Sequence, residues 1–258
     1  MTTSHIVQFS GGISSWGAAR IVKDELMVPG DELVLLFADT LIEDEDTYAF
    51  LEAAAEDLDT ELTRIADGRD IWQVFRDERF LGNSRIDPCS KILKRELLRR
   101  YIEEHFTPEA TIIYLGIDWT EQARLDRARP RWEPWRLEAP LTTATVTKDE
   151  LLADAKARGL PTQRLYTLGL PHANCGGGCV KAGKGHFTKL LQVMPARFKE
   201  WETNEAGLID FLDRDVSILR DTDGSTLTLA ELRRRVELQP SLNLEWEDDL
   251  GGCGCAID

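Results

Sequence analysis

A pair of glycines near the start of the chain could bind an anion. Residues 5–9, His-Ile-Val-Gln-Phe, form a β-prone run that stops at Ser10, and a helical pattern follows from Ser14. Adjacent glycines permit positive φ angles and close backbone approach, and the N-terminus of the next helix directs N–H groups and a positive dipole into the turn. No Gly-Lys-Ser/Thr follows, so the loop is not a Walker A motif. The predicted phosphate-binding residues are Ser10, Gly11, Gly12, Ser14 and Ser15. The alternative is a plain βα turn in which Ser10 or Ser14 caps the helix.

Five cysteines could bind a metal. Cys89 follows a proline, Cys175 and Cys179 flank three glycines, and Cys253 and Cys255 flank one glycine near the end of the sequence. Closely spaced thiols on a flexible backbone suit a soft metal or an iron–sulfur cluster. Zinc is the alternative, with His172 and His186 close enough in sequence to act as ligands. For Cys89 alone, an inert buried thiol is also an alternative.

Composition and net charge limit the class of protein to which this chain can belong. The chain has 258 residues, 42% of them hydrophobic, and a net charge of −15. We expect a cytoplasmic protein without a membrane span, because the sequence shows neither a signal pattern nor an apolar run of about 20 residues. The negative charge argues against broad electrostatic capture of nucleic acid. Lysines and arginines after Cys89 and after Cys179 could still bind phosphate or sulfate locally.

Predicted strands and helices, which would position these residues, alternate along the sequence. Apolar runs at 32–38, 62–65 and 111–115 read as strands, and helical patterns cover 46–57, 71–80, 92–105 and 148–158. This alternation predicts an α/β fold with a doubly wound, mostly parallel sheet. Prolines 130, 134 and 140 are expected to interrupt the pattern. Beyond residue 160 strands and helices no longer alternate. There we predict helices at 181–194 and 197–212 and a hairpin of 216–219 with 226–229.

Two units are therefore predicted. Residues 1–160 would form a nucleotide-binding α/β domain, and residues 161–258 a smaller helical and hairpin subdomain that carries cysteines. Ligands of open α/β sheets bind at the carboxyl ends of the strands. Asp39 and Thr40 end the strongest strand, so they are predicted to lie at such a site.

The loop at residues 10–15, Ser-Gly-Gly-Ile-Ser-Ser, resembles the PP-loop of the adenine nucleotide α-hydrolase superfamily. That superfamily includes ATP pyrophosphatases, tRNA thiolation enzymes and APS/PAPS reductases; its commonest loop has Asp where this chain has Ser14. The segment from Asp39 to Tyr48 resembles the Asp-Thr-Gly…Pro-Glu-Thr-Tyr segment of PAPS reductases, without the Gly and the Pro. The stretch from Gly116 to Arg124 is similar to another loop of that family. The resemblance implies a HUP/PP-loop fold and nucleotide contacts from Asp39, Thr40, Gly116 and Arg124. A surface arginine is the alternative for Arg124.

The cysteine segments also resemble this superfamily. Residues 87–97 are similar to the Cys-Cys-x-x-x-Lys segment of APS reductases with one cysteine replaced, and Cys175 and Cys179 resemble its downstream pair. The resemblance implies a [4Fe-4S] cluster on Cys89, Cys175 and Cys179. The fourth ligand would be Cys253 or Cys255, or one iron would stay open. Lys91 is the basic residue expected to contact nucleotide phosphate. In the reductases a C-terminal cysteine attacks the sulfate, which would make Cys253 and Cys255 catalytic, although the Glu-Cys-Gly-Leu/Ile-His signature is absent.

The resulting prediction is an ATP pyrophosphatase that adenylates an acceptor and couples this step to iron–sulfur-dependent sulfur transfer. Its cofactors would be ATP, Mg²⁺ and the cluster, and its partners a sulfur donor and a nucleic-acid or nucleobase acceptor, with a homodimer left open. One alternative is an APS/PAPS reductase that uses a thiol reductant. Another is a non-catalytic nucleotide-binding regulator with a structural metal.

Overall fold

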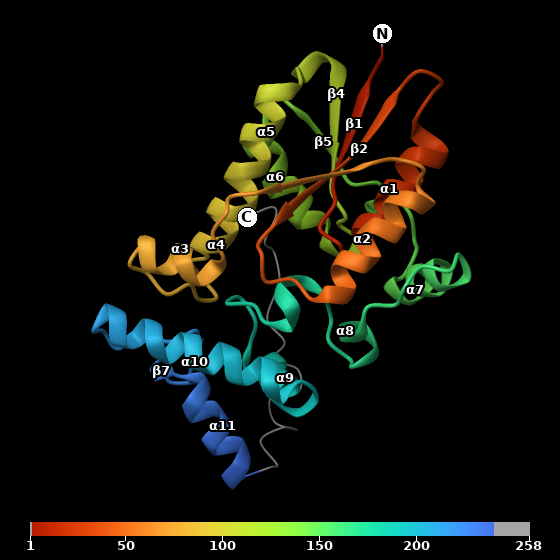
Figure 1. Cartoon of the computed structure of the whole chain (residues 1–258). Coiled ribbons are helices and arrows are strands. Elements are labelled where there is room, and N and C mark those ends of the chain that lie inside the picture. The colour runs from red at the N-terminus through yellow and green to blue at the C-terminus, as the bar shows by residue number, and fades with distance from the viewer. Residues whose placement is uncertain (1, 240–258) are drawn as a thin grey trace.

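The computed structural model describes residues 2–239 and centres on a five-stranded parallel sheet (Figure 1). The strand order is β3-β2-β1-β4-β5, and Val7 in β1 lies opposite both Leu35 in β2 and Tyr114 in β4. The predicted doubly wound parallel sheet is confirmed. The strands are β1 (Ser4–Gln8), β2 (Glu32–Asp39), β3 (Leu62–Ala66), β4 (Thr111–Tyr114) and β5 (Arg136–Glu138).

Helices cover both faces of this sheet (Figure 1). Side chains alternate along a strand, so Val7 and Phe9 pack towards one layer of helices and Ile6 packs towards the other. The first layer contains α1 (Ile13–Ile21), α2 (Glu45–Asp57) and α7 (Lys148–Ala157). The second contains α5 (Leu97–His105) and α6 (Gln122–Trp132). The central strands β1, β2 and β4 are therefore buried on both faces, which explains their apolar runs, whereas the edge strands β3 and β5 are partly exposed.

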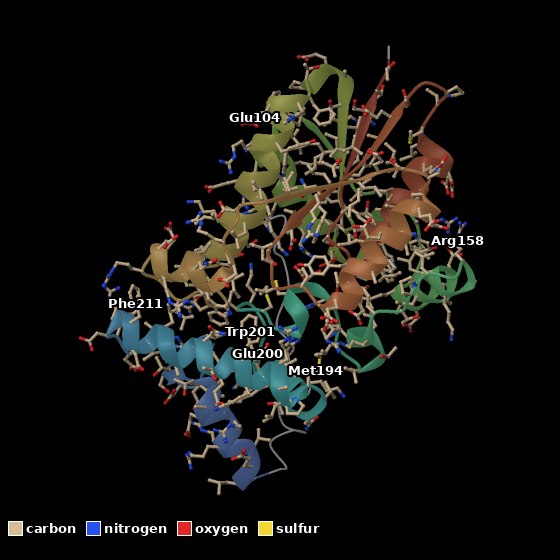
Figure 2. All side chains as sticks on the ribbon, viewed as in Figure 1. Glu104, Arg158, Met194, Glu200, Trp201 and Phe211 are labelled. Atoms are coloured by element: carbon tan, nitrogen blue, oxygen red, sulfur yellow. The ribbon has the colours of Figure 1, made fainter. Side chains whose placement is uncertain are left out.

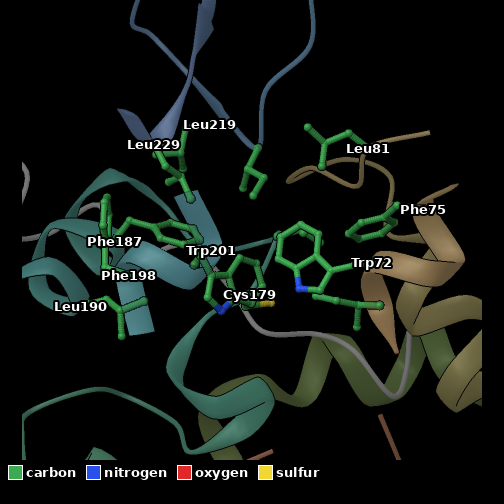
Figure 3. Close-up of a cluster of buried hydrophobic side chains, with 14 of the residues drawn as sticks. Trp72, Phe75, Leu81, Cys179, Phe187, Leu190, Phe198, Trp201, Leu219 and Leu229 are labelled. Carbon is green, nitrogen blue, oxygen red and sulfur yellow. The ribbon is translucent and has the colours of Figure 1, made fainter. Parts of the chain in front are cut away.

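The C-terminal helices form a second core near the carboxyl ends of the strands (Figures 1 and 3). Helix α3 packs there too, so the N-terminal part contributes to this core; Trp72 of α3 lies 4.9 Å from Trp201 between ring centroids. Figure 2 labels Trp201 on α10. The division at residue 160 stays a prediction. The elements are α3 (Ile71–Asp77), α9 (Lys184–Val193), α10 (Pro195–Leu212), β6 (Leu219–Arg220), β7 (Thr226–Leu227) and α11 (Leu229–Leu238).

Short helical segments connect these elements. The segment from Pro88 to His105 is helical throughout and includes a π-helical stretch in its middle. The connecting segments are η1 (Val22–Leu26), α4 (Pro88–Ser90), η2 (Lys91–Glu96), η3 (Pro108–Ala110), η4 (Trp119–Glu121), η5 (Pro140–Thr142), α8 (Arg164–Thr167) and η6 (Asn174–Gly177). In the described part of the chain, no helix combines the length and apolar character that crossing a membrane requires.

The structure differs from the sequence-based expectations in three elements. Pro130 does not interrupt the chain but lies in the last turn of α6, where Ala128 and Trp132 still pack against the sheet. Strand β5 follows it and was not predicted. The hairpin is confirmed with shorter strands, and Gly224 turns it at φ +85°. Helix α11 was also missed, although Thr228 and Glu231 mark its start: the Thr228 hydroxyl accepts a hydrogen bond from the Glu231 backbone N–H at 3.2 Å.

A buried glutamate joins the hairpin and α11 to α10. The Glu205 carboxylate accepts hydrogen bonds from the backbone N–H groups of Ile218 at 2.9 Å and Leu229 at 2.5 Å. Burial raises the pKa of Glu205 from 4.5 to about 7. The folded chain therefore binds this proton more tightly than the unfolded chain does, and the stability that the proton contributes is lost as pH rises from about 4.5 through 7.

We predict that Glu205→Gln flattens the pH dependence of folding in this window. The difference between a pKa of 4.5 in the unfolded chain and about 7 in the folded chain corresponds to about 3 kcal/mol, and glutamine has no proton to lose. Urea unfolding between pH 4.5 and 7.5 measures the effect. The lost carboxylate hydrogen bond lowers the free energy of unfolding by an amount that does not depend on pH. The slope of this free energy against pH is therefore the quantity to compare, and equal slopes in both proteins would contradict the prediction.

Candidate active site

The predicted phosphate loop joins β1 to α1. Gly11 has φ +78°, and a Cβ at this position would lie 2.8 Å from Thr47 Cγ2, so both the backbone angle and the available space favour glycine. Gly12 is the extended N-cap of α1, and the Ser15 hydroxyl donates a hydrogen bond to the Gly12 carbonyl at 2.7 Å. Ser10 Oγ accepts a hydrogen bond from the Gly12 N–H at 3.4 Å. The positive end of the α1 dipole therefore faces a compact turn of small residues, which is an arrangement suited to phosphate.

Gly116 touches this loop from the neighbouring strand. It follows β4, which pairs with β1 on the side away from β2, so the two loops meet where the strand order reverses. That position is where ligands of open α/β sheets bind. A Cβ on Gly116 would lie 2.6 Å from the Ser15 backbone nitrogen and 2.7 Å from its Cα. Glycine is therefore required for the backbones to approach.

Two residues beyond 160 support the loop from the other side. Gln163 Nε2 donates hydrogen bonds to the Gly11 carbonyl at 2.9 Å and to Thr47 Oγ1 at 3.1 Å. The Tyr166 hydroxyl accepts one from the Ile13 N–H at 3.2 Å. The sequence analysis missed both residues, because no local pattern reveals that distant segments meet here.

Asp39 lies at the end of β2, as predicted, but its carboxylate is engaged with the protein. It is fully buried and accepts hydrogen bonds from the Leu41 N–H at 2.8 Å, from the Tyr48 hydroxyl at 2.9 Å and from Arg64 Nε at 2.8 Å. Burial and this carboxylate raise the pKa of Tyr48. Asp39 thus fixes the backbone after β2, including Leu41 at φ +62°.

Glu43 connects three parts of the site. Its carboxylate accepts hydrogen bonds from Thr40 Oγ1 at 3.0 Å and from the Cys175 backbone N–H, and it lies 3.9 Å from Lys94 Nζ. Burial raises the pKa of Glu43, while the Lys94 ammonium acts in the opposite direction. The end of β2, the cysteine loop and the helix after Cys89 are therefore joined through one carboxylate.

The three described cysteines line one small cavity. Cys89, Cys175 and Cys179 border it together with Ser90 and Lys94. Burial and the nearby Asp87 carboxylate raise the pKa of Cys89 to about 12, so this thiol stays protonated unless a cation stabilises the thiolate. The remaining lining residues are Thr40, Ile71, Val180 and Trp201.

The turn that carries Cys175 has an unusual backbone. Cys175, Gly176 and Gly177 have φ values of +54°, +60° and +89°, so three successive residues are left-handed. Gly178 lies against the Trp201 indole, where a Cβ would be 2.1 Å from a ring carbon. Cys179 then enters the core beside Trp201 (Figure 3). The hydrogen bond to Glu43 holds the strained Cys175 in place.

Two other residues that were predicted to bind nucleotide, Lys91 and Arg124, pair with glutamates of the protein. Lys91 is exposed and lies 3.6 Å from Glu96, while Lys94, one turn later, borders the cysteine cavity. The Cys-Cys-x-x-x-Lys spacing would have predicted Lys94. When Ser90 takes the place of the second cysteine, the lysine of the motif falls on residue 94. Arg124, near the start of α6, is half-buried and pairs with Glu121, the last residue of η4.

The remaining candidate metal ligands from the sequence are two histidines and the two cysteines near the end of the sequence. His186, buried at the start of α9, donates a hydrogen bond from Nε2 to the Gly177 carbonyl at 2.7 Å, and its ring stacks on His172 with 5.1 Å between centroids. Cys253 and Cys255 lie outside the described residues. Across residues 2–239, no group of three or more His, Cys, Asp or Glu side chains is arranged to hold a metal ion. The three cysteines therefore share a cavity without forming a ready-made ion site.

The fold is similar to that of a solved enzyme structure. The U34-tRNA thiolase NcsA from Methanococcus maripaludis, solved with its [4Fe-4S] cluster, matches with a TM-score of 0.50 and 14% sequence identity. The match covers 83% of this chain and 72% of the thiolase chain. At this identity the likeness shows the fold alone. No family model and no curated protein matches the sequence.

We predict that Gly116→Ala weakens nucleotide binding at least tenfold. The added Cβ meets the backbone of the loop, which cannot move aside as a flexible side chain would, and such overpacking costs about 1–3 kcal/mol. Gly207→Ala in α10 is the control, because its Cβ meets nothing within 4 Å and alanine favours the helix by about 0.5–1 kcal/mol. Calorimetric titration with an ATP analogue measures the affinity. Equal affinities of the two variants would contradict the assigned position of the nucleotide.

Proposed function

We propose that this chain is a PP-loop enzyme that adenylates a carbonyl group with ATP and then replaces the activated oxygen by sulfur. The observation that carries this proposal is that one residue, Lys94, borders both halves of the site. Lys94 borders the cysteine cavity and also borders a second small cavity next to Ser10 of the phosphate loop. Thr40, at the end of β2, borders the cysteine cavity as well. Phosphate chemistry and thiol chemistry would thus take place side by side.

The nucleotide would bind with its phosphates at residues 10–15 and at the N-terminus of α1. An acceptor carbonyl oxygen would attack the α-phosphorus, the bond to the bridging oxygen would break, and pyrophosphate would leave with Mg²⁺. A sulfur nucleophile would then attack the activated carbon, and AMP would leave with the original oxygen. The Lys94 ammonium, which borders a cavity with Ser10 and lies 3.9 Å from Glu43, would neutralise the charge on the phosphate oxygens, and Glu43 would orient it.

In its donor chemistry, a set of three thiols suits a cluster with an open iron. Cys89, Cys175 and Cys179 provide three thiols around one cavity, and Ser90 borders it in the sequence position of the missing cysteine. A [4Fe-4S] cluster held there would supply bound sulfur for the transfer. Buried apolar side chains such as Trp201 would limit the access of water. The enzyme of similar fold is a U34-tRNA thiolase solved with a [4Fe-4S] cluster, and a nucleobase is the acceptor that we propose for this chain.

Anaerobic purification with iron and sulfide analysis tests the cluster. We expect about four irons per chain in the wild type, and loss of iron in Cys89→Ala, Cys175→Ala and Cys179→Ala. The same preparations are then tested for pyrophosphate and AMP release from ATP with uridine-containing RNA, and for sulfite release from PAPS. Stoichiometric zinc or absence of metal would contradict the sulfur chemistry, and sulfite release would favour the reductase alternative.

We predict that Lys94→Met lowers pyrophosphate release at least tenfold, whereas Lys91→Met changes it less than twofold. Lys94 is buried at the junction of the two cavities, and Lys91 is exposed. Lys94→Met also leaves Glu43 without its cation, so the double variant Lys94→Met/Glu43→Gln removes both charges and should recover stability without recovering activity. A double variant as active as the wild type would contradict a role for Lys94 in the reaction.

A further inference from the structure

Gln8 is a buried polar residue in an apolar strand. Its side chain is 5% exposed, whereas its neighbours Ile6, Val7 and Phe9 are fully buried hydrophobic residues. Within the described residues, neither Nε2 nor Oε1 of Gln8 has a hydrogen-bond partner. A buried amide without partners costs free energy, so methionine or leucine would be expected here if the strand served folding alone. A ligand that pairs with this amide would explain the glutamine.

The position of Gln8 identifies what it would contact. Gln8 lies two residues before Ser10, on the face of β1 that it shares with Ile6 and that packs towards α5. It borders a narrow cavity with Ser10 and Lys94, and Lys94 also borders the cysteine cavity. A group bound to Gln8 would therefore lie between the phosphate loop and the thiols, which is the place that the reacting atom of an acceptor must occupy.

We propose that the Gln8 amide binds the reacting group of the acceptor, a carbonyl with an adjacent N–H such as the edge of a pyrimidine lactam. Nε2–H would donate to the carbonyl oxygen, and Oε1 would accept from the neighbouring N–H. This inference rests on the proposed function and adds the residue that selects the acceptor. An adenine edge could also pair with an amide, but the narrow cavity suits one polar group better than a two-ring base.

Binding of two matched pyrimidines tests the inference. 1-Methyluracil has a carbonyl beside an N–H, and 1,3-dimethyluracil lacks that N–H. The anaerobically purified protein, saturated with a non-hydrolysable ATP analogue, is titrated calorimetrically with each. We expect the wild type to bind 1-methyluracil at least tenfold more tightly, and Gln8→Met to bind both equally weakly. Gln192→Met makes the same chemical change at an exposed position and should behave as the wild type does.

The melting temperature and the affinity for the ATP analogue separate a role of Gln8 in binding the acceptor from a role in binding the adenine. Without ligand, Gln8→Met should melt at a higher temperature than the wild type, because it removes a buried amide without partners. Gln8→Met should also keep the wild-type affinity for the ATP analogue. Loss of analogue affinity in this variant would assign Gln8 to the adenine and overturn the inference. Equal binding of both pyrimidines by the wild type, or a less stable Gln8→Met that keeps the preference, would overturn it too. If the wild type does not bind the analogue, the proposed function itself fails.

Discussion

The site depends on one buried carboxylate. Glu43 follows β2, and it joins Thr40, Lys94 and the Cys175 backbone. Without it, a left-handed cysteine and a buried ammonium would each lose an acceptor in a region of low dielectric, where such losses are most costly. The cysteine loop is more than 130 residues away in sequence. This side chain therefore ties the cysteine loop to the strand ends, together with the Thr47 hydroxyl, which donates a hydrogen bond to the Ala173 carbonyl at 3.4 Å.

The same region is polar where stability alone would favour apolar side chains. Glu43, Lys94 and Gln8 lie under the carboxyl ends of β1 and β2, each less than a tenth exposed. The sheet on either side is filled by valine, leucine, isoleucine and phenylalanine. Natural proteins place such polar groups in their interiors mainly where a site needs them. Gln8 and Lys94 border the cavity beside the phosphate loop, and Lys94 also borders the cysteine cavity, which is the observation behind the proposed passage from phosphorus chemistry to sulfur chemistry.

The sequence predicted the parallel sheet because its strands are continuous apolar runs between helical patterns, and the phosphate loop because two glycines interrupt a strand–helix junction. It placed the three cysteines in one site only through resemblance. It did not reveal Gln163, Tyr166 or the contacts of Asp39, because these depend on tertiary packing between distant segments. Lys91 was chosen over Lys94 because charge alone does not tell which side of a helix faces a cavity. The π-helical stretch from Lys91 to Glu96 changes that direction further.

Crystals grown anaerobically with a non-hydrolysable ATP analogue, measured at the iron absorption edge, would locate the cluster and the nucleotide together. We expect an anomalous iron peak in the cavity bounded by Cys89, Cys175 and Cys179, and nucleotide phosphates against Gly11, Gly12 and the N-terminus of α1. Iron bound elsewhere, a single zinc ion in place of iron, or a nucleotide away from this loop would contradict this expectation.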